Sequence, residues 1–157
     1  PQLFAMFYLT DTTRENGCLR VIPGSHRRRH QLHDLIGTAH TAETRRMDDP
    51  GSLLYAEFED QVDVLARAGD LVLGDGRALH ASHANRSDHE RTVMTVWYHP
   101  MFSELQESTQ AQISNLAQAE FEFWPQAAKD AIGPLAANYR GSAIPLPRDR
   151  IPGIELH

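Results

Sequence analysis

The sequence predicts a mainly β chain with helices at its C-terminal end, organised as a single domain over residues 1–157. Short β-prone runs separated by turn residues fill the first hundred positions, whereas the residues after Pro100 are rich in Ala, Gln and Glu at helical spacing. Strands first and helices last are typical of an α+β chain built on an antiparallel sheet. A hydrophobic share of 41% and a charged share of 23% are those of an ordinary globular protein.

The expected strands are apolar, β-branched and aromatic runs that end at turn residues. Residues 3–9 are almost wholly apolar, which predicts a buried strand, and Asn16-Gly17 is a sharp turn signal after it. Pro23-Gly24 stops the second run, and Ala68-Gly69-Asp70 predicts a tight turn. The predicted strand runs are residues 3–9, 18–22, 62–66, 71–73, 78–82 and 92–98.

The last two of these runs flank turn residues 85–88, so we expect them to pair as an antiparallel hairpin. Residues 25–52 are polar and rich in His and Arg, which predicts a long surface excursion with one helical turn. Residues 103–120 and 125–139 have helical spacing, and Gly133-Pro134 is expected to break the second helix. The proline-containing tail after residue 140 is expected to lie extended over the surface.

Composition and charge limit the partners that we expect. The formal net charge of −6 disfavours binding to a phosphate backbone, so we expect no nucleic acid partner. No apolar run approaches the ~20 residues that span a bilayer, so we expect no membrane segment. Cys18 is the only cysteine and has no internal disulfide partner, which makes a cytoplasmic location the default expectation. Because the chain begins at Pro1 within a strand-like run, we expect it to be the C-terminal portion of a longer protein.

Candidate chemistry is concentrated between Gly69 and Arg91. On a strand, His80 and Ser82 share one face, and His83 points to the other. An imidazole suits iron, copper or zinc, and an arginine suits a carboxylate. A metal beside an arginine is what a 2-oxo-acid cosubstrate needs, so this pattern predicts a metal and cosubstrate pocket.

Two segments resemble the signatures of the phytanoyl-CoA dioxygenase family, a branch of the Fe(II)/2-oxoglutarate-dependent dioxygenases. The first runs from Glu15 to His26 and ends in Pro-Gly-Ser-His; the second is His80-x-Ser82-x-x-Asn85-x-Ser87-x-x-x-Arg91. The resemblance covers roughly residues 3–100. It implies that residues 1–100 are the C-terminal part of a double-stranded β-helix (jelly roll), incomplete at its N-terminus, and that residues 101–157 are a helical and extended C-terminal region.

The same resemblance implies roles for four residues. His80 would be the distal histidine ligand of Fe(II), and Arg91 would pair with the far carboxylate of 2-oxoglutarate. Ser82 would add a hydrogen bond to that carboxylate, and Met6 would face inward beside the cosubstrate. The implied activity is hydroxylation, or another oxidation, of an unactivated C–H bond in a small organic substrate; halogenation stays open, and the sequence does not identify the substrate.

The sequence departs from the family pattern at the metal site. The family takes its first histidine and its carboxylate from a His-x-Asp motif upstream of the strand that begins here at Gln2. This chain contains no His-x-Asp or His-x-Glu, and so supplies one metal ligand of three. We expect the motif to lie in a preceding segment; the alternative is a protein that has lost its metal.

Each assignment competes with a simpler interpretation. His80 competes with a hydrogen-bonded core histidine, and Arg91 with a solvent-exposed arginine at a strand end. Asp75 is either a partner of the site or a turn aspartate, and Cys18 is expected to be a small buried residue. The arginine runs 27–29 and 45–46 are expected to be solvated surface.

Two other functions remain open. One is a non-catalytic cupin-like binding module, or an inactive homologue that lacks the metal motif. The other is a structural subunit whose exposed strand edges pair with a partner chain. Iron-dependent turnover of 2-oxoglutarate by the longer protein separates the oxygenase from the first, and a monomer that stays folded without a partner counts against the second.

Overall fold

The structure is a computed structural model that describes residues 2–37, 49 and 51–147. The described residues fall into two compact units, one made of residues 2–100 and the other of residues 101–147. Parts of the expected surface excursion, Arg45 and Arg46 among them, and the end of the expected C-terminal tail lie outside the described residues.

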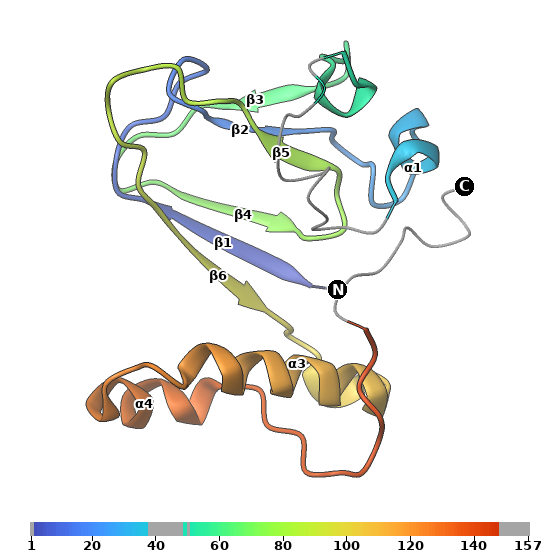
Figure 1. Cartoon of the computed structure of the whole chain (residues 1–157), viewed down its shortest axis with the longest axis vertical. Coiled ribbons are helices and arrows are strands. Elements are labelled where there is room, and N and C mark those ends of the chain that lie inside the picture. Colours follow the sequence, from blue (N-terminus) through green and yellow to red (C-terminus); the bar gives the residue numbers. More distant parts are fainter. Residues whose placement is uncertain (1, 38–48, 50, 148–157) are drawn as a thin grey trace. The chain divides into compact units, whose positions relative to one another are not determined.

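The described residues of the first unit form two antiparallel sheets of three strands each (Figure 1). In one sheet, β1 (Leu3–Tyr8) lies between β4 (Leu71–Asp75) and β6 (Val93–Tyr98). In the other, β2 (Leu19–Val21) lies between β3 (Val62–Val64) and β5 (His80–Ser82). The prediction of a mainly β chain with few helices is therefore confirmed.

The expected hairpin between residues 78–82 and 92–98 is wrong. β5 pairs with β2, and β6 pairs with β1 in the other sheet. The segment between β5 and β6 therefore crosses from one sheet to the other instead of forming a tight turn. The alternation of a strand determines which face is buried but not which strand becomes its neighbour.

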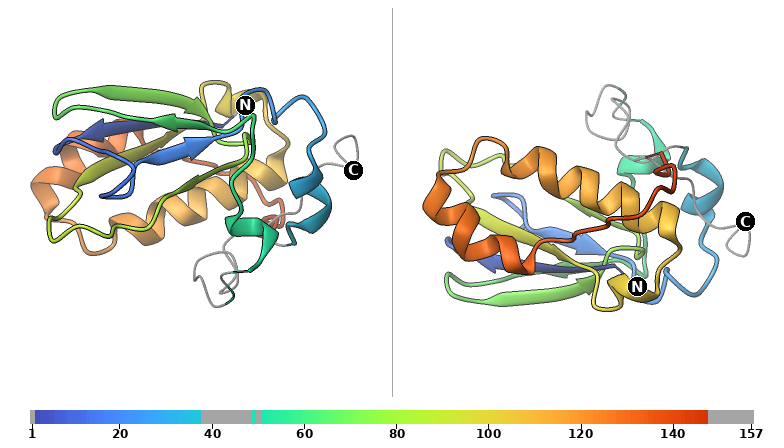
Figure 2. Two further views of the ribbon diagram at one scale, coloured as in Figure 1. Left: turned by 90° about the horizontal axis from the view of Figure 1, so that it is seen from above. Right: turned by 90° about the horizontal axis from the view of Figure 1, so that it is seen from below.

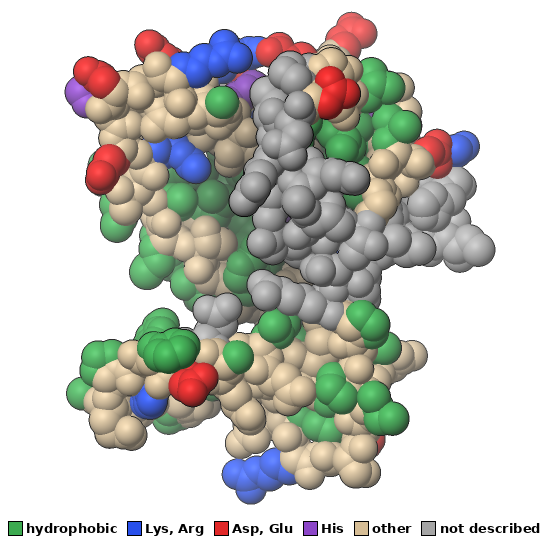
Figure 3. Space-filling model, viewed as in Figure 1, with side chains coloured by type: hydrophobic (Ala, Val, Ile, Leu, Met, Phe, Trp, Pro, Cys, Tyr) green, Lys and Arg blue, Asp and Glu red, His purple; other side chains and the backbone are tan. Residues whose placement is uncertain are grey.

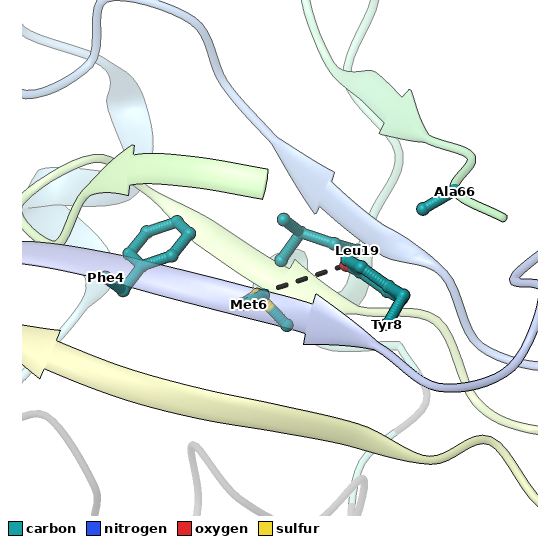
Figure 4. Packing of buried hydrophobic residues seen from close by; sticks show 5 residues of the cluster. All are labelled: Phe4, Met6, Tyr8, Leu19 and Ala66. Atoms are coloured by element: carbon teal, nitrogen blue, oxygen red, sulfur yellow. Dashed lines mark hydrogen bonds between the residues drawn. The ribbon is translucent and has the colours of Figure 1, made fainter. Parts of the chain in front are cut away.

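The core of the first unit is formed by inward-facing side chains of both sheets (Figure 4). Alternate residues of β1 point inward, as the period of two along a strand requires. Burying each large side chain contributes about 1.5–3 kcal/mol to the free energy of unfolding. The buried cluster comprises Phe4, Met6, Tyr8, Leu19 and Ala66.

Two glycines adopt the left-handed backbone conformation where the sequence predicts turns. Gly69 has φ +93° in the turn before β4, and Gly17 has φ +94° just before β2. A Cβ atom at Gly17 would lie 2.8 Å from the carbonyl oxygen of His83, so the approach of these two backbones requires a glycine. β4 extends beyond the predicted run 71–73 and includes Gly74.

Short helices interrupt the first unit. α1 (Gln31–Leu35) is the helical turn expected after residue 25, and its N-cap is His30, whose ring accepts a hydrogen bond from the Leu32 amide. The 3₁₀ helix η1 covers Leu53–Tyr55. The guanidinium of Arg20 donates hydrogen bonds to the carbonyl oxygens of Leu54 and Ala56, which attaches the η1 segment to β2.

The second unit is helical. It contains α3 (Glu107–Phe121) and α4 (Gln126–Ile132), with the 3₁₀ helices η2 (Phe102–Glu104) and η3 (Gly133–Leu135), and Figure 2 shows the chain reversing direction between α3 and α4. α4 ends before Gly133-Pro134, as predicted. None of the helices described is long and apolar enough to cross a membrane.

Candidate active site

A cavity of about 300 Å³ lies in the first unit and is lined by side chains of both sheets. It brings together three of the four predicted site residues, from β1 and β5. The lining residues are Phe4, Met6, Leu19, His80, Ala81, Ser82, Thr95 and Trp97.

His80 begins β5 and is held by two contacts. Its Nδ1 lies 2.8 Å from the carbonyl oxygen of Ala78. Because a carbonyl oxygen only accepts hydrogen bonds, Nδ1 carries the proton, and the lone pair of Nε2 is left to bind a metal. The imidazole also packs on the ring of Phe4, with 5.3 Å between the ring centroids.

The position of His80 is further fixed by Ser25, which is 2% exposed. Its hydroxyl donates to the carbonyl oxygen of Ile22 at 2.7 Å and accepts from the backbone N–H of Leu79 at 2.7 Å. The Ile22 N–H in turn donates to the Leu79 carbonyl oxygen at 3.0 Å. The Pro-Gly-Ser-His segment therefore secures the start of the strand that carries His80.

Ser82 and Met6 face the cavity from opposite sheets. Ser82 is opposite Leu19 in the strand register, two residues after His80, so both side chains lie on the inner face of β5. The Met6 sulfur accepts a hydrogen bond from the Tyr8 hydroxyl, with 4.0 Å between the two atoms. Figure 4 shows this pair inside the core.

Arg91 precedes β6 and is not among the residues that line the cavity. Its Nη1 atom is buried and finds no hydrogen-bond acceptor among the described residues. Burial raises the pKa of Tyr8, and the nearby Arg91 guanidinium partly offsets that rise. A buried guanidinium nitrogen without an acceptor is suited to an anionic ligand.

Tyr8 is a candidate that the sequence reasoning missed. Its side chain is fully buried and lies close enough to Arg91 for the guanidinium charge to act on its hydroxyl. The available signal was the alternation of Phe4, Met6 and Tyr8 along one strand, which places all three on the same face.

Asp75 is not a partner of His80. Its carboxylate accepts two hydrogen bonds from the Arg77 guanidinium, at 2.9 and 2.7 Å, and one from the Arg77 backbone N–H. These contacts lower the pKa of Asp75 to about 2. The interpretation as a local structural aspartate is therefore the one the structure supports.

Asn85 holds the turn after β5. Its amide donates to the carbonyl oxygen of His89 at 2.8 Å and accepts from the Ser87 N–H at 3.0 Å. His83 points away from the cavity and lies 2.8 Å from a carboxylate oxygen of Asp63. In the part of the chain that the structure describes, no group of three possible metal ligands includes His80.

The phytanoyl-CoA dioxygenase (PhyH) family model matches residues 2–93. The chain is 32% identical over 104 residues to a phytanoyl-CoA dioxygenase domain-containing protein 1 homolog of Dictyostelium discoideum, which covers 59% of this chain and 32% of the relative. It is 34% identical over 91 residues to phytanoyl-CoA dioxygenase 1 of Oryza sativa subsp. japonica, covering 56% of this chain and 29% of the relative. The chain thus spans about a third of the length of these curated relatives.

Among solved structures, the chain is similar to HygX from Streptomyces hygroscopicus, with a TM-score of 0.50 and 25% sequence identity over 65% of this chain and 38% of HygX. HygX has been solved without metal, with iron, and with nickel and 2-oxoglutarate. Because the family model matches more than half of the sequence, this chain belongs to the phytanoyl-CoA dioxygenase family.

Proposed function

We propose that this chain is the C-terminal part of an Fe(II)- and 2-oxoglutarate-dependent oxygenase that oxidises a C–H bond of a small organic substrate. The observation that carries the proposal is the cavity between the sheets, with the metal-competent His80 on its wall. Beside it stands the buried Nη1 atom of Arg91, which has no acceptor among the described residues. Family membership supports it, and so does the similarity to HygX, which binds iron and 2-oxoglutarate.

His80 would hold the iron through Nε2, since its Nδ1 proton is committed to the Ala78 carbonyl. When bound, the iron supplies the oxygen activation that side chains alone lack. A non-haem iron of this class takes two histidines and one carboxylate. The proposal therefore assigns the other two ligands to polypeptide outside this chain.

Arg91 would bind the far carboxylate of 2-oxoglutarate. The carboxylate would supply the acceptor that Nη1 lacks, and the planar guanidinium matches two carboxylate oxygens. Ser82 offers a hydroxyl for a further hydrogen bond, and Met6 an apolar wall that excludes water. Phe4 is a positioning residue, because its ring supports the imidazole of His80.

We further infer that residues 1–100 are the C-terminal part of a double-stranded β-helix and that residues 101–157 are a helical and extended C-terminal region. The chain enters one sheet with β1, the other with β2 and β3, and then alternates through β4, β5 and β6, as a jelly roll does. The outer strands of the two sheets, β3, β4, β5 and β6, each have one edge without a partner strand among the described residues. Strands from elsewhere in the protein would pair with these edges.

The deciding experiment measures 2-oxoglutarate consumption and iron content in the longer protein that contains this chain. We expect near-stoichiometric iron, and iron-dependent conversion of 2-oxoglutarate that falls more than about a hundredfold in His80→Ala. His89→Ala is the matched control, since the side chain of His89 is 82% exposed. Unchanged turnover in His80→Ala would contradict the proposal. Binding of 2-oxoglutarate without any turnover would instead favour the non-catalytic binding module.

A further inference from the structure

A second group of metal-ligating side chains lies on the opposite face of the β3–β2–β5 sheet from His80. It comprises Cys18, Asp63 and His83, which we call the outer cluster. One potential ligand atom from each residue lies within 4.8 Å of the other two. The outer cluster shares no residue with the cavity.

Strand pairing builds the outer cluster. The His83 backbone N–H donates to the Cys18 carbonyl oxygen at 3.0 Å, which places these residues opposite each other at the ends of β5 and β2. Gly17 permits the close approach of the two backbones at this point. Asp63 comes from β3, where it is in register with Arg20, two residues along from Cys18 on the same face.

Cys18 is fully buried, and its thiol forms no side-chain hydrogen bond with another of the residues described. Burial raises the pKa of this thiol, with a further contribution from the negative charge of Asp63. The thiol is therefore a poor nucleophile in the apo chain. Metal coordination reverses this, because the cation displaces the thiol proton to solvent and stabilises the thiolate.

The surroundings of the outer cluster carry charge that favours a cation. His83 lies 2.8 Å from Oδ1 of Asp63, and Arg14 donates to Oδ2 of the same carboxylate at 3.2 Å. Arg14 also pairs with Glu57. The carboxylates of Asp63 and Glu57 therefore share the single guanidinium of Arg14, which leaves negative charge beside the outer cluster for a cation to neutralise.

We propose that the outer cluster binds one divalent transition-metal ion of the zinc class through Cys18 Sγ, an imidazole nitrogen of His83 and a carboxylate oxygen of Asp63. Thiolate, imidazole and carboxylate together select a borderline-soft ion over magnesium or calcium. A tetrahedral site with these ligands has about 3.3–3.8 Å between ligand atoms, so the three side chains close around the ion and the His83–Asp63 contact opens slightly. Water takes the fourth position, and Arg14 orients the ligating carboxylate from outside.

The site is tested by titrating the purified, reduced longer protein that contains this chain with Co²⁺ and recording the thiolate-to-cobalt charge-transfer band in the near ultraviolet. The part of the band that Cys18→Ser abolishes reports on this residue. We expect a saturable band with one Co²⁺ per chain that Zn²⁺ abolishes by competition. His83→Gln and Asp63→Asn should each weaken Co²⁺ binding by at least about tenfold, as loss of a ligand requires.

One variant separates this site from the proposed iron site. His80→Ala should leave the cobalt band unchanged, because His80 faces the cavity on the other side of the sheet. His89→Gln is the matched control for His83→Gln. A folded chain, judged by circular dichroism, that gives no thiolate band would overturn the inference. So would a band that His83→Gln leaves at full affinity. Neither result depends on whether the longer protein turns over 2-oxoglutarate.

Discussion

The hydroxyl oxygen of Ser25 lies 2.7 Å from the backbone nitrogen of Leu79, the residue that precedes His80. This bond connects the two segments by which the chain resembles its family, although 54 residues separate its partners. The Pro-Gly-Ser-His segment contributes no ligand to the cavity and acts instead on the backbone that carries the metal-competent histidine.

Ser25→Ala should reduce the free energy of unfolding by about 1–3 kcal/mol, because the Leu79 N–H loses its acceptor in a partly buried position. Urea denaturation measures the loss. Ser142→Ala, at an exposed position, is the control and should change the free energy by less than about 0.5 kcal/mol. Equal stability of the two variants would show that the Ser25 hydroxyl does not secure β5.

Arg91→Met in the longer protein should raise the KM for 2-oxoglutarate by about ten- to a hundredfold, since a charge-assisted hydrogen bond contributes about 1.5–3 kcal/mol. Stability should not fall, because methionine fills similar space and removes a buried donor that lacks an acceptor. Steady-state kinetics and thermal unfolding give the two readouts. Arg86→Met, at an exposed position, should change neither; a KM unaffected by Arg91→Met would exclude its role in cosubstrate binding.

Gly74→Ala should destabilise the first unit by about 1–3 kcal/mol, because a Cβ atom at this position would overlap the ring of Phe4 directly opposite it. Phe4→Leu should relieve part of this loss, so that the double-mutant cycle shows a coupling energy. Gly37→Ala is the matched control, since its Cβ would meet open space. Additive losses in the cycle would argue against steric contact between Gly74 and Phe4.

Asp75→Asn should lower the free energy of unfolding at neutral pH by about 1–2 kcal/mol. This value allows for screening of the Asp75–Arg77 ion pair by solvent, because the Arg77 side chain is exposed. The Arg77 contacts lower the pKa of Asp75 to about 2 in the folded chain. The stabilisation is therefore complete above the unfolded pKa of about 3.9 and disappears as the pH falls towards 2. Denaturation curves between pH 2 and 7 should show that the free energy of unfolding of Asp75→Asn falls less steeply with decreasing pH than that of the parent chain. Asp88→Asn is the control, since its side chain is 90% exposed, and it should follow the parent chain.

On the face shown in Figure 3, acidic and basic side chains of the first unit lie intermingled. The formal net charge of the whole chain is −6.

The sequence by itself determined the features that depend on neighbouring residues. The apolar run of β1 predicted the buried strand, Gly69 the turn before β4, and Gly133-Pro134 the end of α4. Alternation along a strand placed His80 and Ser82 on one face and His83 on the other; in the structure His80 and Ser82 line the cavity, whereas His83 contacts Asp63. Each of these follows from local geometry, since the periodicity of a strand and the conformational range of glycine or proline need no distant partner.

Only the tertiary structure decided which strands pair and which hydrogen-bond partners each polar group has. β5 and β6 are neighbours in sequence, yet they belong to different sheets, and the unsatisfied donor of Arg91 is visible only when the surrounding core is known. The outer cluster joins residues from positions 18, 63 and 83. Pairing of such distant segments depends on loop closure and on the burial available to the whole chain, which no local pattern encodes.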